Sequence, residues 1–459
     1  MSLSADPIYQ SLINPLQRIL DDFGFTAFTP VQQQSLPLLL KNRDVIAQAQ
    51  TGSGKTLAFA LGLLTRIDTQ QRHTQALVLC PTRELADQVA KEIRKLARYI
   101  DNLKVLTLCG GMPFGPQLAS LEHGAHVVVG TPGRIMEHLR KGTLQTDRLS
   151  VLVLDEADRM LDMGFVDSIR DVVALTPKTR QTLLFSATYE DNVAELREEF
   201  QRDAEFIEIA KVAELQPDIQ QYFLSTNPEN KFQQLLDTLS HFEPQQAIVF
   251  CHTKADTQDT ADLLQAHNLS ALALHGDLDQ KQRDQVFVRF ANKSCCILVA
   301  TDVAARGIDV KDLDMVISYD TSRDVDVHTH RVGRTGRAGA KGIAVNFVSE
   351  KEAYKVEAIS TRFNTEPEWL TLKPNPSAQI FAPMVTIAFD AGRKNKLRAG
   401  DILGTLTAGI GLEKAQVGKI DIFDFHAYVA IERDVAKSTL KALQQRKIKG
   451  RVIKSRILR

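Results

Sequence analysis

Residues 151–158 read Val-Leu-Val-Leu-Asp-Glu-Ala-Asp, and about a hundred residues earlier, residues 49–56 read Ala-Gln-Thr-Gly-Ser-Gly-Lys-Thr. The earlier stretch has the glycines, the lysine and the hydroxyl of a phosphate-binding loop, except that Ala49 stands where the pattern has its first glycine. The later stretch is an apolar run, typical of a buried strand, that ends in carboxylates. Together they predict an α/β fold with a nucleotide phosphate site at the end of a strand.

The residue types of these two stretches indicate their chemistry. Backbone N–H groups of the loop would surround phosphate oxygens, and Lys55 would reach the outer phosphates. Thr56 and Asp155 would hold Mg²⁺, partly through water, while Glu156 would orient the attacking water. The predicted nucleotide-binding loop residues are Ala49, Gln50, Thr51, Gly52, Ser53, Gly54, Lys55 and Thr56. A glycine turn or an acidic loop alone is often only a turn or a solvated loop, but both motifs in this order favour nucleotide hydrolysis.

Composition limits the class of protein. The 459 residues provide room for two or three domains, and 44% hydrophobic with 24% charged residues is typical of a soluble globular chain. The five cysteines show no C-x-x-C spacing, so we expect buried, reduced thiols. The N-terminus lacks the pattern of a signal peptide and no apolar run reaches membrane-spanning length, which predicts a cytoplasmic protein without a membrane partner.

The net charge of zero conceals an asymmetry. Residues 385–459 carry 16 Lys/Arg against 7 Asp/Glu, whereas the first 384 residues carry 40 against 49. A basic segment that follows an acidic one indicates an appendage for a polyanion, although a merely soluble basic tail would have the same balance.

Strand-like apolar runs alternate with helical patterns through the first 360 or so residues, which predicts doubly wound parallel sheets. We expect a first such domain over residues 1–210 and a second over residues 216–363, whose strands begin at residue 247. Residues 364–384, with several prolines, are predicted to be a linker. Residues 385–459 show the βαββαβ order of an RNA-recognition-motif (RRM) fold, an α+β domain, with a last strand at residues 451–458.

Further motifs occur in a fixed order around these two stretches. They are Thr29-Pro30-Val31-Gln32, Pro81-Thr82-Arg83-Glu84-Leu85-Ala86, Thr131-Pro132-Gly133-Arg134, Ser186-Ala187-Thr188, the run from Ala300 to Asp309, and the run from His330 to Arg337. With the phosphate loop and residues 153–158, they resemble those of a DEAD-box RNA helicase from Tyr9 to about Arg362. The resemblance implies two RecA-like domains, with ATP and Mg²⁺ as cofactors and RNA as a partner.

The resemblance also implies roles for residues. Gln32 and Phe25 would read the adenine, Gly307 and Asp309 would contact the nucleotide, and Arg334 and Arg337 would be arginine fingers. Tyr9 is the nearest candidate for stacking on adenine, with helix packing as the alternative. Ser186, Thr188 and His330 would couple the two domains, whose closure would be required for hydrolysis. The RNA-contact candidates of the two domains are Pro81, Thr82, Arg83, Gly111, Thr131, Gly133, Arg134, Arg283 and Thr301.

Residues 400–404, 417–422 and 447–451 resemble the C-terminal RNA-binding domain of ribosomal-RNA helicases of the DEAD-box protein A type. This implies targeting to a hairpin of large-subunit (23S) ribosomal RNA and a role in 50S subunit assembly on pre-50S particles. His426 and Tyr428 stand where stacking aromatic residues of an RRM sheet are expected, and Thr386 occupies the other such position, so we expect weak base stacking there. Tyr428 could be only a sheet residue. The RNA-contact candidates are instead Arg393, Lys394, Lys396, Lys447, Lys449 and Arg451.

The sequence therefore predicts a monomeric RNA-dependent ATPase that locally unwinds RNA duplexes. One alternative is an ATP-gated RNA clamp or assembly scaffold with little unwinding. Another is a DNA helicase, against which the Asp-Glu-Ala-Asp motif, Gln32 and the C-terminal domain argue, so no DNA partner is expected.

Overall fold

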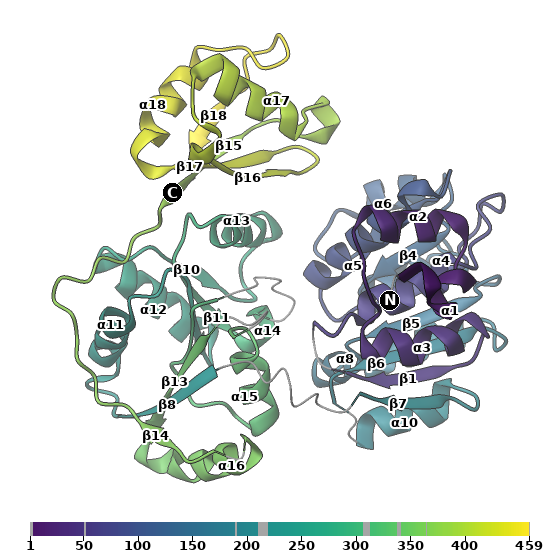
Figure 1. The fold of residues 1–459 in the computed structure, drawn as a ribbon, viewed down its shortest axis with the longest axis horizontal. Helices are drawn as coiled ribbons and strands as arrows, with labels where there is room; N and C mark the ends of the chain where they lie inside the picture. The colour runs from purple at the N-terminus through teal and green to yellow at the C-terminus, as the bar shows by residue number, and fades with distance from the viewer. Residues whose placement is uncertain are drawn as a thin grey trace. The chain divides into compact units, whose positions relative to one another are not determined.

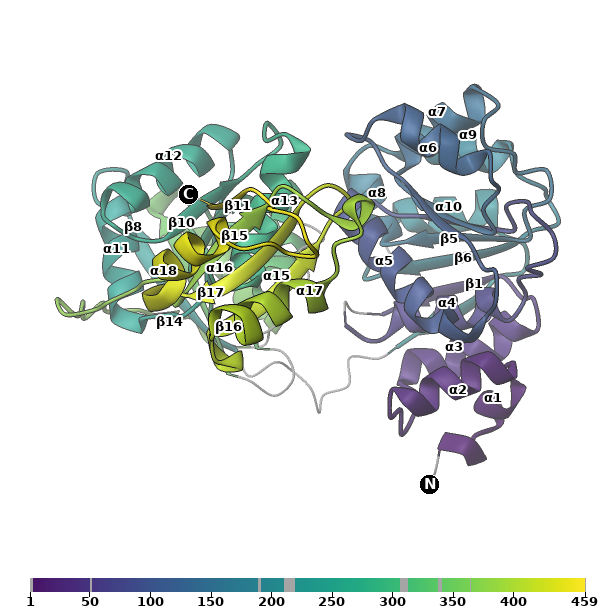
Figure 2. The ribbon, with the colours of Figure 1, turned by 90° about the horizontal axis from the view of Figure 1, so that it is seen from above.

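The computed structural model describes residues 3–49, 52–188, 191–209, 219–305, 313–336, 341–363 and 365–458. The chain divides into two compact units, Met1–Ala213 and Glu214–Arg459, and each is described by itself (Figures 1 and 2).

The first unit is built on a sheet of seven parallel strands in the order β3-β4-β2-β5-β6-β1-β7. The strands are β1 (Val45–Gln48), β2 (Ala76–Leu79), β3 (Val105–Leu108), β4 (Val127–Gly130), β5 (Val151–Asp155), β6 (Gln181–Ser186) and β7 (Glu205–Glu208). The helices are α1 (Pro7–Ser11), α2 (Asn14–Asp22), α3 (Pro30–Leu40), α4 (Lys55–Leu64), α5 (Arg83–Leu96), α6 (Phe114–Leu121), α7 (Pro132–Arg140), α8 (Ala157–Asp162), α9 (Val166–Ala174) and α10 (Asp191–Phe200).

Helices cover both faces of this sheet, so strands β2, β4, β5 and β6 are buried at every position and consist mostly of apolar residues. Along β2, Ala76 and Val78 pack into the core beneath α1–α5, whereas Leu77 and Leu79 pack into the opposite core with α7–α10. The doubly wound parallel fold predicted for this part of the chain is confirmed.

The second unit contains a second sheet of seven parallel strands, in the order β10-β11-β9-β12-β13-β8-β14. The strands are β8 (Ile219–Thr226), β9 (Ala247–Cys251), β10 (Ala271–Leu274), β11 (Ile297–Thr301), β12 (Met315–Ser318), β13 (Gly342–Ser349) and β14 (Glu368–Trp369). The helices are α11 (Lys231–Phe242), α12 (Lys254–Ala266), α13 (Gln280–Ala291), α14 (Asp302–Ala305), α15 (Val325–Val332) and α16 (Ala353–Phe363).

Two details of the second sheet differ from the sequence-based expectation. The strands begin at β8, before residue 247, and β14 lies inside the segment expected to be only a linker, where it pairs with β8. β8 was missed because it is partly exposed and mixes polar with apolar residues, so it lacks the continuous apolar run of a buried strand.

The C-terminal module (residues 384–458) is a four-stranded antiparallel sheet in the order β16-β17-β15-β18. Its elements are β15 (Met384–Phe389), α17 (Ala399–Gly404), β16 (Val417–Ile422), β17 (Ala427–Glu432), α18 (Arg433–Gln444) and β18 (Ser455–Ile457). The βαββαβ order is confirmed. The first helix continues as a π-helical turn over Thr405–Ile410, and the last strand is only three residues long, shorter than expected.

One face of the module's sheet packs on α13 and the residues that follow it. The Thr386 hydroxyl accepts a hydrogen bond from Asn292 Nδ2 (2.9 Å) and donates one to Ser294 Oγ (2.8 Å). Beside this pair, Ala388 and Tyr428 form an apolar cluster with Val288 of α13. Tyr428 is therefore a buried sheet residue, and the positions of Thr386 and Tyr428, expected to stack weakly on bases, are used for packing within the chain.

Two expectations from composition can be compared with the structure. All five cysteines are buried and free, as expected, and burial raises the pKa of Cys251 to about 12. Among the residues that the structure describes, no helix has both the length and the apolar character needed to cross a membrane.

Candidate functional site

The candidate residues of the first unit divide between two halves of one sheet edge. Carboxyl ends of parallel strands meet at the same edge, and the strand order places β5, β6 and β1 side by side, with β2, β4 and β3 beyond β5. The phosphate loop follows β1, and Asp155 and Ser186 are the last residues of β5 and β6. The candidates for RNA contact follow β2, β3 and β4.

The phosphate loop leads directly into α4, whose first residue is Lys55. Gly54 precedes the helix with φ of +94°, and a side chain there would bring a Cβ to 2.3 Å from Gln32 Nε2. Glycine is thus required at this position both for its backbone angle and for space. Gln32 Nε2 donates to Gly54 O (3.1 Å), and Gln32 Oε1 accepts from Thr29 N (2.9 Å), so Gln32 joins the Thr29–Gln32 motif to the loop.

Lys55 belongs to the phosphate loop, and its side chain turns back toward the first residue of that loop. Its Nζ donates to Ala49 O at 2.8 Å, and the side chain is buried. The Lys55 amine is therefore held next to Ala49, where the loop begins. Its positive charge acts to lower the pKa of Asp155 at the end of β5.

Asp155 is buried at the end of β5. Desolvation, followed by the nearby charge of Glu156, raises the pKa of Asp155 to about 7, and the charge of Lys55 opposes this rise. A bound divalent cation would favour the ionised carboxylate. The Asp155 carboxylate and the Thr56 hydroxyl are hard oxygen ligands of the kind that Mg²⁺ prefers, so these residues fit the expected ion.

Glu156 is fixed by its backbone and by one buried arginine. It occupies the left-handed region (φ 55°, ψ 53°), unusual for a residue with a side chain, where the chain turns from β5 into α8. Arg159 Nη1 donates to Glu156 Oε2 at 2.7 Å, and only 2% of the Arg159 side chain is exposed. Arg159 is absent from the residues predicted for the site, although its spacing of three residues along a helix from Glu156 could have indicated the pair.

Asp158 connects the acidic motif to the segment after β6. Its Oδ2 accepts from the backbone N–H groups of Ala187 (3.2 Å) and Thr188 (3.3 Å) and from the Thr188 hydroxyl (3.3 Å). Ser186 is fully buried, and its backbone carbonyl accepts from Ala49 N at 2.9 Å. The Ser186–Thr188 segment thus contacts both the acidic motif and the phosphate loop.

The RNA candidates of the first unit lie where strands end and helices begin. Thr82 caps α5 by accepting from Leu85 N (3.3 Å), and Thr131 accepts from Gly110 N (3.3 Å). Arg134, in α7, donates to Met112 O (2.9 Å) and pairs with Glu137 (3.0 Å). Two threonine hydroxyls and an arginine therefore lie at the carboxyl ends of β2, β3 and β4. The remaining candidates follow the same three strands and are Pro81, Arg83, Gly111 and Gly133.

The two aromatic candidates near the adenine-reading motif differ. Phe25 is half-buried and packs near Phe23, with ring centroids 6.5 Å apart. Tyr9 is buried in the core, and its hydroxyl donates to Asp21 Oδ2 at 2.8 Å. Tyr9 therefore packs among the helices, which is the alternative to stacking on adenine.

In the second unit, a buried ion pair joins the segment after β11 to α15. Arg331, only 1% exposed, donates from Nε to Asp302 Oδ1 (2.7 Å) and from Nη2 to Asp302 Oδ2 (2.9 Å). Its Nη1 donates to Asp320 O at 2.6 Å. Thr301, at the end of β11, accepts from Ala304 N (3.3 Å), so the candidate residue Thr301 begins the helix that carries Asp302.

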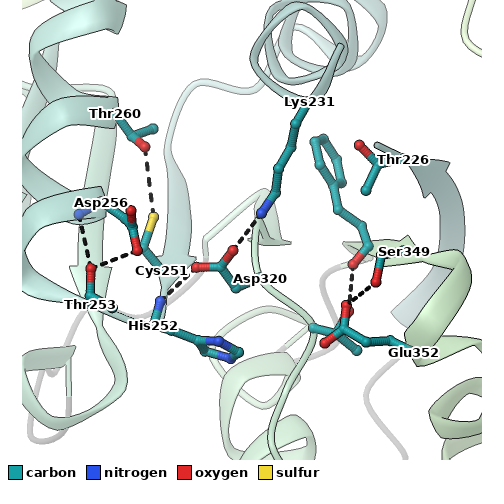
Figure 3. A network of polar contacts seen from close by, with 12 residues as sticks. Thr226, Lys231, Cys251, His252, Thr253, Asp256, Thr260, Asp320, Ser349 and Glu352 are labelled. Carbon is teal, nitrogen blue, oxygen red and sulfur yellow. Dashed lines mark hydrogen bonds and ion pairs between the residues drawn. The ribbon is translucent and has the colours of Figure 1, made fainter. Parts of the chain in front are cut away.

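Asp320 is the centre of the polar network in Figure 3. Its carboxylate forms an ion pair with Lys231 of α11 and accepts from His252 N, after β9, at 2.7 Å. Glu352 forms a neighbouring group by accepting from Ser349 (2.7 Å) and Thr321 (3.0 Å). These bonds fix the ends of β9, β12 and β13 relative to one another.

Replacing Asp302 with alanine is expected to lower the free energy of unfolding of the second unit by about 3–5 kcal/mol, because the buried Arg331 would lose its charged partner. The chain has a single tryptophan, Trp369, which packs against Phe223 of β8 with ring centroids 6.0 Å apart. Its fluorescence during denaturant unfolding therefore reports on this unit. Asp277→Ala, which breaks the exposed Lys254–Asp277 pair, is the matched control and should leave the unfolding midpoint nearly unchanged. Equal midpoints for the two variants would contradict the prediction.

His330 and Arg334 line a small cavity beside the Asp302–Arg331 pair. Arg334 is 6% exposed, and His330 is half-buried. Arg283 lies on α13 and is half-buried. Gln50, Thr51, Gly307, Asp309 and Arg337 lie outside the described residues.

In the C-terminal module, the basic candidates come together from two separate segments. Lys449 Nζ donates to Lys396 O (2.9 Å) and pairs with Asp401 (2.8 Å). The basic loop (residues 393–398) is thus joined to the segment before β18. The exposed cations that this contact brings to one end of the module are Arg393, Lys394, Lys396, Lys447, Lys449 and Arg451.

Comparison with known proteins decides the family. Residues 29–196 match the model of DEAD/DEAH box helicases, residues 230–339 that of the helicase conserved C-terminal domain, and residues 386–457 that of the DbpA RNA binding domain. The ATP-dependent RNA helicase DbpA of Escherichia coli (strain K12) is 50% identical over 441 residues, which are 96% of each chain. The chain belongs to the DbpA-type DEAD-box RNA helicases.

Other proteins similar to this DbpA-type helicase support the same family assignment. The Bacillus subtilis (strain 168) helicase of the same name is 36% identical, over 95% of this chain and 96% of its own. A structure of S. cerevisiae Dbp5 bound to RNA and ADP BeF3 is 32% identical, with a TM-score of 0.71, covering 78% of this chain and 94% of that chain. A structure of Mss116p bound to ssRNA and AMP-PNP is 27% identical, with the same TM-score, covering 82% and 80%.

These comparisons confirm the RecA-like character of both seven-stranded sheets and the family expected from the motifs. The DbpA-type helicase is an ATP-dependent RNA helicase, and family members bind adenine nucleotides, as the solved structures with ADP BeF3 and AMP-PNP show.

Proposed function

We propose that this ATP-dependent RNA helicase locally unwinds or remodels RNA duplexes near a hairpin of 23S ribosomal RNA during assembly of the 50S subunit. The observation that supports this targeting is the hydrogen bond that joins the basic loop to the segment around Lys449 at one end of the module. A cluster of exposed cations on a small domain suits the phosphates of a folded RNA. The helicase would act as a cytoplasmic monomer on pre-50S particles, without a DNA or membrane partner.

In the first unit, the proposed ATP site uses groups already held in place. Gln32 would read the adenine edge, for which an amide offers both a donor and an acceptor. The loop of residues 49–56 would surround the phosphates, with Lys55 moving from Ala49 O to the outer phosphate oxygens. Glu156 would orient the attacking water, so its bond to Arg159 keeps it in place before that water arrives.

Thr56 and Asp155 would hold Mg²⁺, which would neutralise charge on the phosphates. The position of Asp155 at the end of β5, close enough to Lys55 to feel its charge, supports this assignment, and a bound divalent cation would favour the ionised form of this buried carboxyl.

The second unit would supply the remaining groups. Arg334, Arg337, Gly307 and Asp309 are proposed to act on the nucleotide, so turnover would require both units. Ser186, Thr188 and His330 would couple the two domains, linking the bound nucleotide to their closure. The contacts of Asp158 with Ala187 and Thr188 support this role for the first unit, since they join the acidic motif to that segment.

The RNA candidates of the two RecA-like domains favour contacts with the RNA backbone. Hydroxyls, backbone N–H groups and arginines at strand ends suit phosphates and riboses, and such contacts carry no sequence information directly. The core would therefore act on many sequences, and selectivity would come from the C-terminal module.

The proposal is tested by steady-state ATP hydrolysis with no RNA, random RNA and tiled fragments of 23S ribosomal RNA at a fixed salt concentration. We expect strong activation by one fragment and weak activation by the others. Equal activation by all RNAs would contradict the targeting, and activation without strand separation would favour the ATP-gated clamp.

Neutralising two basic-loop lysines, in the double variant Lys394→Gln and Lys396→Gln, is expected to weaken binding of the activating fragment. Both residues are exposed, and the proposal assigns phosphate contacts to both. Each lost contact should reduce the slope of log affinity against log salt by about 1. Fluorescence anisotropy at several salt concentrations measures this slope. Lys351→Gln, which removes an exposed lysine outside the module, is the control, and equal slopes for the two proteins would contradict the assignment.

A further inference from the structure

The C-terminal module cannot use the centre of its sheet to stack bases, since α13 covers it. Thr386 and Ala388 are each 1% exposed and Tyr428 is 3% exposed. Tyr428 packs against Val288 and meets Phe423 edge to face, with ring centroids 5.5 Å apart. An RNA that needs an aromatic platform must find it elsewhere on the module.

Phe425 offers such a platform at the turn between β16 and β17. Its side chain is 63% exposed, and among the described residues of the module it is the aromatic ring most open to water. The turn itself is closed by a hydrogen bond from Phe423 N to His426 O (2.8 Å). A single exposed apolar residue is common on protein surfaces, so its meaning depends on what surrounds it.

Two cationic residues of the basic loop are bonded through their backbones to the turn that carries Phe425, whose own neighbour Asp424 is acidic. Arg393 N donates to Phe423 O (2.8 Å) and Lys394 N to Asp424 O (2.9 Å), so two consecutive residues of the basic loop are bonded to the two residues that precede Phe425. The Arg393 guanidinium donates to Ile422 O (2.8 Å). Gly392 permits this approach, because a Cβ there would lie 2.2 Å from Phe423 O.

We propose that Phe425 stacks on an unpaired base of the bound RNA, while Arg393 and Lys394 contact the phosphates on either side of that base. This rests on the proposed function and adds a subsite to it. Alternating phosphates and unpaired bases match this pairing of cations with one exposed ring, as in other proteins that bind single-stranded RNA. Stacking tolerates any base, so the subsite contributes affinity while other contacts select the sequence.

The test compares binding of the full chain and its variants to the most strongly activating 23S fragment across a series of salt concentrations. Phe425→Ala is expected to weaken binding about 5- to 150-fold with an unchanged salt slope, because a stacked base is lost and no phosphate contact is. Phe425→Trp should restore binding. Lys394→Gln should instead reduce the salt slope by about 1. Tyr354→Ala removes an aromatic ring on α16 that is 71% exposed, and this matched control should bind as the unchanged protein does.

A second arm uses the same fragment with its loop bases paired into a continuous duplex. Phe425→Ala should then bind as tightly as the unchanged protein, since no unpaired base is available. Equal affinity of the two proteins for the unpaired RNA, or an equal loss on both RNAs, would overturn the inference. Failure of the proposed targeting has a different signature, in which the unchanged protein binds all fragments equally.

Discussion

Replacing Arg334 with alanine is expected to lower the rate of RNA-stimulated ATP hydrolysis by about 10³- to 10⁵-fold, the range found for arginine fingers in phosphoryl transfer. Arg334 is nearly buried, beside His330 and the Asp302–Arg331 pair, so its position depends on the fold of the second unit. Alanine removes the guanidinium that would stabilise charge in the transition state. Single-turnover hydrolysis at saturating ATP and RNA measures the chemical step.

Two controls separate this role from a structural one. Arg334→Lys keeps the charge but lacks the planar guanidinium group. Its rate of hydrolysis should therefore be almost as low as that of Arg334→Ala. Binding of a fluorescent ATP analogue should change little, since the proposal places the phosphate loop and Gln32 on the first unit and Arg334 contributes to the transition state. Trp369 fluorescence reports whether the second unit remains folded. A rate within tenfold of the unchanged protein would show that Arg334 is no arginine finger.

Glu156→Gln should lower hydrolysis by about 10²- to 10⁴-fold, the usual contribution of a general base, while ATP and RNA still bind. Glutamine has nearly the same shape and can still accept the hydrogen bond from Arg159, but it takes up a proton far less readily. The protein should therefore remain bound to RNA in the presence of ATP. Release of phosphate in a single turnover, with RNA retention followed in parallel, measures both effects.

Arg159 provides the comparison for Glu156. Arg159→Lys keeps a cation beside Glu156 but shortens its reach, so we expect a smaller loss of hydrolysis than in Glu156→Gln. If Glu156→Gln hydrolysed ATP at the normal rate, the water-orienting role would have to be given to another residue. If Arg159→Lys lost as much activity as Glu156→Gln, the arginine would be needed for more than holding the carboxylate.

The sequence predicted those parts of the molecule whose chemistry is local. The phosphate loop needs glycines and a lysine in one short segment, and Gly54 adopts the backbone angle that only glycine takes easily. Buried parallel strands such as β2 and β5 appear as continuous apolar runs. The βαββαβ order of the module could likewise be derived from alternating patterns and turns.

Contacts between distant segments could not be predicted in this way. Asp302 and Arg331 are 29 residues apart, and nothing in either motif indicates that one neutralises the other. The partners of Thr386 lie more than 90 residues away, so a covered sheet face could not be distinguished from an open one. β14 was missed because a two-residue strand carries no periodicity.

The covered face also has a bearing on how such helicases diversify and can be engineered. A module grafted onto another helicase by its linker alone would expose Tyr428, Ala388 and the Thr386 hydroxyl to water. Such an exposed apolar surface would promote aggregation. A recipient would have to present an apolar residue and polar partners equivalent to Val288, Asn292 and Ser294. Substitutions at these positions should therefore be inherited in matched sets, and chimaeras should exchange α13 together with the module.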